Sequence, residues 1–179
     1  MNLLKAEIIT NRLLLKPISM EYKEENFSEF TEEITLYTYP RAAKVISETE
    51  LFIKKSLEEL ENGISLQLVV LAKDSLEFLG CASLHNLAKK PQLGIWLKKA
   101  AHGNKYGLET ITAIKDWADK NLDYEYLFYP VDKANIASRK IAEALGGTVW
   151  WEYQKTNLSG NVLNTLEYRI HKGKRFNWG

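Results

Sequence analysis

The sequence has few of the features that mark secreted, membrane-spanning or nucleic-acid-binding chains. Cys81 is the only cysteine, so no intrachain disulfide can form, which fits a reducing compartment. No apolar run approaches the roughly 20 residues that span a bilayer. Lys5, Glu7 and Arg12 interrupt the apolar N-terminus, unlike the core of a signal peptide. The net charge of +1 gives no strong attraction to nucleic acid or acidic lipid, so we expect a cytoplasmic protein without such partners.

Signs of a division into domains are also lacking. The chain shows no linker, low-complexity segment or internal repeat. Its 45% hydrophobic and 26% charged residues are the balance of an ordinary globular protein, and 179 residues can bury one sizeable core. We expect a single domain over residues 1–179.

The first third of the chain predicts a strand and then helices. Residues 8–18 alternate in the manner of a strand, and residues 21–37 carry aromatic side chains at roughly helical spacing. A clearer amphipathic helix begins at Ser47, where Ser47 and Glu50 match a capping box. The pair Asn62–Gly63 ends this helix.

The rest of the chain predicts a mixed α/β order. Short connections between the next three strands favour an antiparallel meander, after which helices and strands alternate. A central sheet flanked by helices is therefore expected. The expected strands are residues 66–72, 78–87, 92–97, 124–131, 148–155 and 162–171, and the expected helices are residues 106–120 and 135–145.

A glycine-containing loop, residues 102–107, leads directly into one of these helices. Backbone amides at a helix start lie at the positive end of the helix dipole and bind anions such as phosphate. Gly103 and Gly107 would let a ligand approach the backbone without a Cβ in the way. An ordinary turn is the alternative, because two glycines before a helix are a weak motif on their own.

Asn135 and Ser138 lie three residues apart at the start of the next helix. Asn is a common N-cap, which would give Asn135 a purely structural role. Alternatively, both side chains face a ligand, because residues three apart share a helix face. The two interpretations stay open at the level of these residues alone.

In combination, these segments resemble the GNAT acetyltransferases, and most of all the RimJ/RimL branch, which includes acetyltransferases of ribosomal-protein N-termini. The similarity lies in residues 10–15 (Thr-Asn-Arg-Leu-Leu-Leu), 94–97 (Gly-Ile-Trp-Leu), 134–138 (Ala-Asn-Ile-Ala-Ser) and 145–146 (Leu-Gly), and it covers nearly the whole chain. It implies the GNAT fold, an α/β (α+β) domain with a mixed, mostly antiparallel sheet. The sheet should have about seven strands and splay between the fourth and fifth. The resemblance also implies acetyl-CoA as co-substrate and a primary amine, on a protein N-terminus or a small molecule, as acceptor.

The chain departs from the family pattern at several positions. The family loop usually reads Arg or Gln, two free positions, Gly, one free position and Gly or Ala, where this chain has His102, Lys105 and Gly107. If the Lys105 position requires a left-handed backbone, lysine costs about 1–2 kcal/mol there. Otherwise its side chain points to solvent. Gln92, which cannot take a proton, stands where this branch often has a Glu.

The resemblance implies direct attack of a neutral amine on the thioester, without a covalent acyl-enzyme. Ser138 would stabilise the leaving thiolate, and a backbone amide from a strand bulge near Trp96 and Leu97 would stabilise the oxyanion. His85 is the best-placed candidate base, because an ordinary histidine titrates near neutral pH. A structural or exposed histidine is the alternative, and Glu167 is a weaker candidate base.

The predicted site therefore has three sets of residues, and no metal site is expected. The catalytic candidates are Ser138 and His85. Trp150, Trp151 and Tyr153 are candidates for an acceptor pocket, with sheet packing as the alternative. The predicted cofactor-binding residues are Trp96, Leu97, His102, Gly103, Asn104, Lys105, Tyr106, Gly107, Asn135 and Ser138.

Other classes of function stay open beside an N-acetyltransferase. The altered loop and the Gln at position 92 favour a non-catalytic CoA-binding regulatory module or an acyltransferase that uses another acyl-CoA. A nucleic-acid or membrane binder is disfavoured, because the chain has no basic stripe. We expect a monomer or a homodimer.

Overall fold

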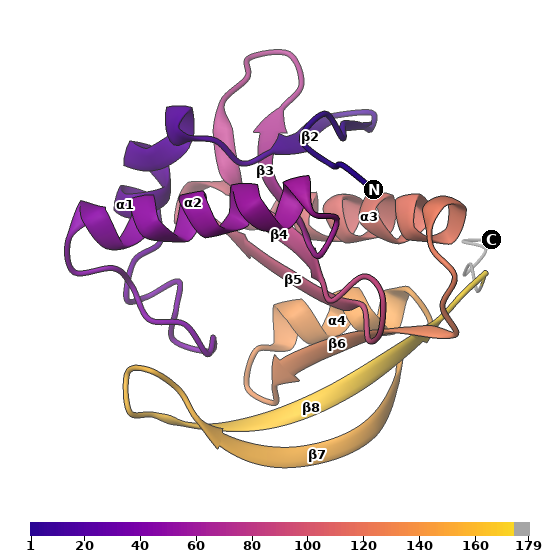
Figure 1. The fold of residues 1–179 in the computed structure, drawn as a ribbon. Helices are drawn as coiled ribbons and strands as arrows, with labels where there is room; N and C mark the ends of the chain where they lie inside the picture. Colours follow the sequence, from indigo (N-terminus) through magenta and orange to yellow (C-terminus); the bar gives the residue numbers. More distant parts are fainter. Residues whose placement is uncertain (174–179) are drawn as a thin grey trace.

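An eight-stranded sheet forms the centre of the protein in a computed structural model that describes residues 1–173 (Figure 1). Residues 174–179 of the expected domain lie outside the described residues. The strands are β1 (Ile8–Ile9), β2 (Leu13–Pro17), β3 (Leu66–Ala72), β4 (Phe78–His85), β5 (Gln92–Leu97), β6 (Tyr126–Asp132), β7 (Thr148–Thr156) and β8 (Val162–His171). The helices are α1 (Lys23–Glu29), α2 (Ile46–Glu61), α3 (Tyr106–Asn121) and α4 (Ile136–Ala144), with short 3-10 turns at Met20–Tyr22 and Lys99–Ala101.

The strands follow the order β1-β2-β3-β4-β5-β6-β8-β7 across the sheet. Neighbouring strands pair antiparallel, except that β5 and β6 are parallel. A parallel pair needs a crossover connection, and α3 supplies it between β5 and β6. The predicted mixed, mostly antiparallel sheet flanked by helices is confirmed.

The first predicted strand is wrong in one respect, because residues 8–18 form a hairpin of two strands. Ile8 pairs with Leu15 across β1 and β2. At the turn the Thr10 amide donates to the Leu13 carbonyl over 2.9 Å, and the Thr10 hydroxyl accepts from the Leu13 amide over 2.9 Å. Residues 10–12 contain neither glycine nor proline, so the turn left no strong signal in the sequence.

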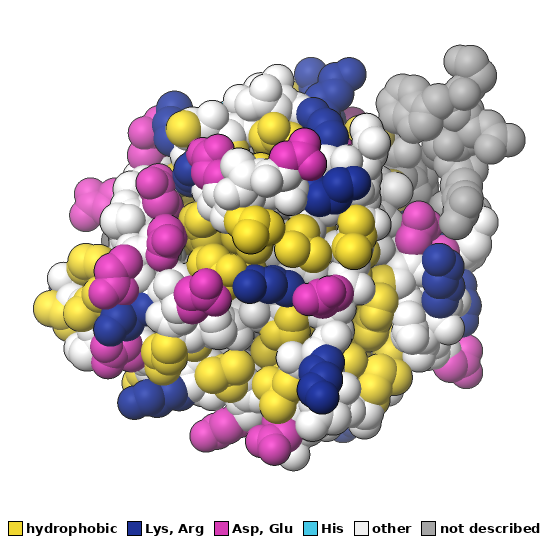
Figure 2. Space-filling view, turned by 90° about the horizontal axis from the view of Figure 1, so that it is seen from above, with side chains coloured by type: hydrophobic (Ala, Val, Ile, Leu, Met, Phe, Trp, Pro, Cys, Tyr) yellow, Lys and Arg dark blue, Asp and Glu magenta, His cyan; other side chains and the backbone are white. Residues whose placement is uncertain are grey.

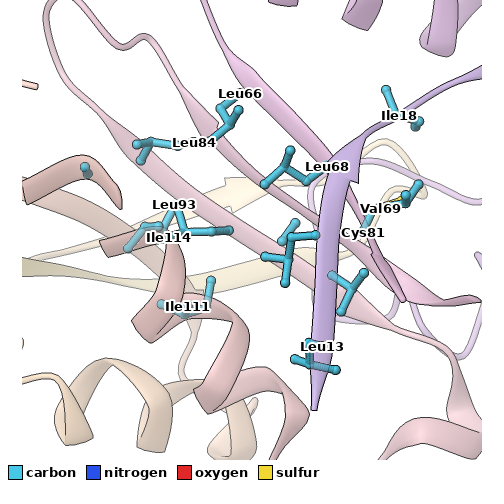
Figure 3. Close-up of a cluster of buried hydrophobic side chains, with 14 of the residues drawn as sticks. Leu13, Ile18, Leu66, Leu68, Val69, Cys81, Leu84, Leu93, Ile111 and Ile114 are labelled. Atoms are coloured by element: carbon cyan, nitrogen blue, oxygen red, sulfur yellow. The ribbon is translucent and has the colours of Figure 1, made fainter. Parts of the chain in front are cut away.

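Helices cover both faces of the sheet. On one face, Ile111 and Ile114 of α3 lie beside Leu93 of β5 in a buried apolar cluster (Figure 3). On the other face, Asn26 of α1 donates a hydrogen bond to the sulfur of Cys81 over 3.3 Å. β3 lies between these two layers and is almost entirely buried, which explains its nearly continuous apolar run.

The start of α2 differs from the predicted capping box. The helix begins at Ile46, and its N-cap residue Val45 makes no side-chain hydrogen bond. Glu48, rather than Ser47 or Glu50, carries out the capping contact, because its carboxylate accepts from the Lys44 amide over 2.8 Å. The predicted capping box is therefore wrong, since Glu48 satisfies the backbone just before the helix. The predicted end at Asn62–Gly63 is confirmed, with Asn62 as the C-cap residue.

Charges of both signs are interspersed on the surface. Figure 2 shows basic and acidic side chains scattered among hydrophobic ones, with no field of a single sign on that face. Within residues 1–173, no helix has the length and apolar character needed to cross a membrane.

The sheet opens between β5 and β6, which meet at one end and diverge toward the other (Figure 1). In the described part of the chain the two strands pair only at Gln92 and Phe128. There the Phe128 amide donates to the Pro91 carbonyl over 2.9 Å. The splay predicted between the fourth and fifth strands is thus confirmed, one number higher because of the extra hairpin strand.

Candidate active site

The loop before α3 is held in a conformation that suits glycine. Lys105, the N-cap residue of α3, has φ of 60° and ψ of 17°, which is left-handed. Gly103 is also left-handed, with φ of 81°. The Lys105 position therefore requires a left-handed backbone, and lysine is strained there by about 1–2 kcal/mol.

The first turn of α3 offers backbone amides to an anion. The Lys105 side chain has no acceptor and makes no capping hydrogen bond. The amides of Tyr106, Gly107 and Leu108 therefore lack an N-cap acceptor at the positive end of a 16-residue helix. A Cβ built on Gly103 meets nothing within 4 Å, so open space lies beside the loop. This geometry fits a phosphate group.

Arg12 and Glu109 fix this loop from outside. Glu109, in the first turn of α3, accepts hydrogen bonds from the Thr10 hydroxyl over 2.6 Å and from Arg12 Nε over 2.7 Å. Arg12 also donates to the Asn104 carbonyl over 3.0 Å and lies over the Tyr106 ring. Burial alone would raise the pKa of Glu109, but the hydrogen bonds from Thr10 and Arg12 lower it below its ordinary value. Glu109 is therefore ionised, and Arg12 offsets its charge at the start of α3.

Backbone groups of β5 face the opening toward β6. Alternate residues of a strand direct their amides and carbonyls to opposite neighbours. The Lys98 amide donates to β4, whereas the Pro91 carbonyl accepts from β6, so Ile95 and Leu97 direct their backbone groups into the opening. The Leu97 carbonyl accepts from His102 Nε2 over 2.9 Å, which ties the end of β5 to the loop.

The bulge expected near Trp96 and Leu97 is wrong. β4 and β5 pair in unbroken register from Gly80–Leu97 to His85–Gln92, and the register shift lies between β3 and β4 instead. Gly80 permits this close pairing, because a Cβ there would lie 2.1 Å from the Trp96 carbonyl oxygen. The Trp96 backbone is directed to β4, so of the two backbone amides only that of Leu97 points into the opening between β5 and β6.

Asn135 and Ser138 have different partners at the start of α4. Asn135 is the N-cap residue, and its side-chain oxygen accepts from the Ser138 amide over 3.2 Å. The predicted N-cap role of Asn135 is thus confirmed, and Asn135 also lines the cavity described below. The Ser138 hydroxyl lies 2.7 Å from the hydroxyl of Tyr129, which projects from β6.

The sequence reasoning missed Tyr129. It lay within a predicted strand, and no local spacing connects it to Ser138, nine residues further along the chain. Burial raises the pKa of Tyr129 to about 12, although the hydrogen bond to Ser138 acts in the opposite direction. Tyr129 therefore keeps its proton at neutral pH and can donate it to the Ser138 oxygen.

A cavity of about 670 Å³ reaches the opening between β5 and β6. Tyr129, Asn135 and Ser138 line it on one side of the opening, and Gly94 and Trp96 line it from β5. The cavity therefore lies against both strands that border the opening, and the Ser138 hydroxyl is part of its lining.

His85 lines the same cavity from the end of β4, opposite Gln92. Burial lowers the pKa of His85 below its ordinary value of 6.5, while Glu59 raises it and Lys55 lowers it. His85 is therefore mostly neutral at neutral pH, and a ring nitrogen is free to accept a proton.

Other predicted residues lie away from the cavity. The loop of residues 102–107 is not part of its lining and lies beyond the end of β5. Of the three predicted acceptor-pocket aromatics only Tyr153 lines the cavity, whereas Trp150 and Trp151 on the edge strand β7 are 66% and 58% exposed. Trp150 lies over the Arg169 guanidinium at 3.8 Å. Glu167 is also absent from the lining.

An eight-stranded, mostly antiparallel sheet that opens beside a crossover helix is an α/β fold shared with solved structures. RimL, an alpha-N-protein acetyltransferase of a ribosomal protein in complex with coenzyme A, superposes with a TM-score of 0.82 at 14% identity, covering 94% of this chain and 100% of that chain. The Salmonella typhimurium acetyl transferase that modifies the N-terminal serine of a 50S ribosomal subunit protein gives 0.81 at 14% identity, covering 93% and 99%. Spermidine N-acetyltransferase from Vibrio cholerae, with CoA and spermine, gives 0.80 at 14% identity, covering 92% and 98%.

Residues 12–148 match the family model of the acetyltransferase (GNAT) domain, and the chain belongs to this family. The predicted family is thereby confirmed. No curated protein matches the chain by sequence.

Proposed function

We propose that the protein transfers an acetyl group from acetyl-CoA to a primary amine. The observation that carries the proposal is the opening between β5 and β6, because the cavity at Ser138 borders it and the bare start of α3 follows the end of β5. Family membership supports acetyl-CoA as the co-substrate, as do the two neighbouring structures described with CoA. The acceptor is a protein N-terminus or a small-molecule amine. A cytoplasmic location is part of the proposal, supported by a single, buried cysteine.

The proposed role of the loop is to bind the pyrophosphate of CoA. The amides of residues 106–108 donate to the phosphate oxygens, and the dipole of α3 adds to the attraction. Gly103 keeps space for the ligand, and the exposed Lys105 contributes a positive charge. The tie between Arg12 and Glu109 holds these groups in place.

The proposed chemistry occurs at the opening. The Leu97 amide donates to the thioester oxygen as negative charge develops there. The amine nitrogen bonds to the acetyl carbon, the carbon–sulfur bond breaks, the nitrogen loses a proton and the sulfur gains one. Ser138 donates a hydrogen bond to the departing sulfur, and Tyr129 donates to Ser138 in turn, which leaves the Ser138 hydrogen free for this task. His85, neutral and lining the same cavity, is the proposed base that accepts the proton of the amine.

Binding of CoA is tested by calorimetry with Gly103→Glu, which places a carboxylate beside the phosphates. We expect the Kd to rise about tenfold or more through charge repulsion. Gly160→Glu is the matched control, because Gly160 has φ of 86° against 81° for Gly103 and is equally open to solvent. Equal affinity in the two variants would remove the loop from the proposed site.

A coenzyme A-binding module without catalysis is the second candidate, favoured by the neutral Gln92 at the cavity. Release of free thiol from acetyl-CoA in the presence of a panel of amines separates the two. Binding without thiol release would support the module. Release from a longer acyl-CoA alone would support an acyltransferase of different acyl specificity.

A further inference from the structure

The lining of the cavity beside Ser138, which we call the aromatic wall, includes several aromatic side chains. Its aromatic residues are Phe30, Tyr37, Tyr39, Phe52, Trp96, Tyr129 and Tyr153. Tyr37, Tyr39 and Phe52 are 39%, 43% and 42% exposed, so their rings retain uncovered surface. Rings with uncovered faces bind flat or apolar bodies by stacking and by burial of apolar area.

The carboxylates of this wall are already engaged. Glu48 accepts hydrogen bonds from both terminal nitrogens of Arg41, over 2.8 and 3.1 Å. These bonds, together with that from the Lys44 amide, lower the pKa of Glu48 to about 2, so it stays ionised and paired. Each oxygen of Asp132 accepts from a backbone amide over 2.8 Å. Among the described residues of the wall, every carboxylate oxygen therefore has a donor.

The remaining charged groups do not attract a second cation. Lys155 places its Nζ 3.7 Å from the centre of the Tyr39 ring, which takes up that aromatic face. Arg41 and Lys155 balance Glu48 and Asp132, and His85 is mostly neutral because burial lowers its pKa. The wall thus carries no formal net charge.

On the basis of the function proposed above, we propose that the acceptor is a primary amine of single charge on an aromatic or apolar body, and not a polyamine. The body packs against the aromatic wall, while the amine reaches the opening between β5 and β6. A cavity of about 670 Å³ lies within the range of about 300–1,000 Å³ typical of small-molecule sites. A polyamine would place further ammonium groups against a wall without a free carboxylate, where their lost hydration is not repaid.

The acceptor class is tested with the whole protein and acetyl-CoA by thiol release. Phenethylamine and tryptamine represent the proposed class, spermidine and putrescine represent polyamines and diamines, and a peptide with an N-terminal serine represents protein acceptors. We expect kcat/KM for phenethylamine to exceed that for spermidine by about tenfold or more. Spermidine or the peptide as the best acceptor would overturn the proposed class.

A single substitution should shift this selectivity. Arg41→Gln leaves the charge of Glu48 uncompensated in the wall, so the ratio of kcat/KM for spermidine to that for phenethylamine should rise about tenfold. Lys23→Gln is the matched control. Lys23 of α1 pairs with Glu50, which lies on α2 as Glu48 does, but neither Lys23 nor Glu50 lines the cavity. Thermal unfolding checks that both variants fold. An unchanged ratio in Arg41→Gln would contradict the charge argument.

The outcomes distinguish this inference from the function on which it rests. Thiol release led by spermidine or by the peptide overturns the acceptor class and leaves the acetyltransferase function standing. No release with any amine, from protein that binds CoA in calorimetry, overturns both.

Discussion

At the scale of the residue, the backbone conformation of Lys105 decides whether lysine at this position costs stability. The sequence allowed two outcomes, a strained left-handed lysine or a relaxed one directed to solvent. The positive φ of 60° selects the first. A family glycine position is therefore occupied here at a cost in stability, and the start of α3 still has no side-chain cap.

Lys105→Gly should therefore stabilise the protein. Glycine adopts the left-handed conformation freely, and we expect a gain of about 1 kcal/mol in the free energy of unfolding, measured by urea denaturation. Lys105→Ala is the control, because alanine removes the charge but keeps the strain. A gain in Lys105→Ala equal to that in the glycine variant would attribute the effect to charge instead.

His85 should make stability depend on pH. Its folded pKa lies below the unfolded value near 6.5, so its favourable contribution is complete above that value and is lost as pH falls toward the folded pKa. Between about pH 7.5 and 5.5 the Tm of the native protein should fall more steeply than that of His85→Gln. Parallel Tm curves would show that His85 titrates alike in both states.

At the scale of the element, the start of α4 carries two polar side chains with different partners. Asn135 caps the helix, whereas Ser138 connects it to Tyr129 of β6. The spacing of three residues predicts that the two side chains share one face of the helix. Their different partners follow only from the packing of α4 on β6.

Asn135→Ala and Ser138→Ala should therefore behave differently. Loss of the cap should cost about 0.5–2 kcal/mol of stability. Ser138→Ala should slow turnover about ten- to a hundredfold and also destabilise by about 1 kcal/mol or more, because the buried Tyr129 hydroxyl loses its partner.

The double variant Ser138→Ala with Tyr129→Phe separates these two effects. Removing both hydroxyls leaves no polar group without a partner, so most of the stability should return while turnover stays low. Wild-type turnover in Ser138→Ala at saturating acetyl-CoA would rule out its role at the leaving sulfur.

At the scale of the whole molecule, the cavity is enclosed by segments far apart in sequence. The turn between β7 and β8 reaches the segment before α2 (Figure 1). There the Asn157 side chain donates to the Thr38 carbonyl over 3.1 Å, and the Leu158 amide donates to the Tyr39 carbonyl over 3.0 Å. The buried Asn157 also accepts from two amides of its own turn. This contact holds the aromatic wall in position.

Asn157→Ala should loosen that enclosure. We expect a loss of about 1–3 kcal/mol of stability and a higher KM for the acceptor, because the wall near Tyr39 loses its support. The Kd for CoA should stay constant, since the loop before α3 lies outside the cavity. Asn164→Ala is the control, because the Asn164 side chain bonds only to exposed Gln154 among the described contacts. A changed CoA affinity in Asn157→Ala would show that the two sites are coupled.

The sequence alone determined the features that depend on local pattern. Alternating and continuous apolar residues located the strands, Asn62–Gly63 ended α2, and the glycine loop marked the start of α3, because each signal lies within a few neighbouring residues. Only the tertiary structure decided the left-handed backbone of Lys105, the Tyr129–Ser138 pair and the hydrogen bond that holds Tyr39 of the aromatic wall to Leu158. These depend on which distant segments pack together, and side-chain periodicity carries no information about that choice.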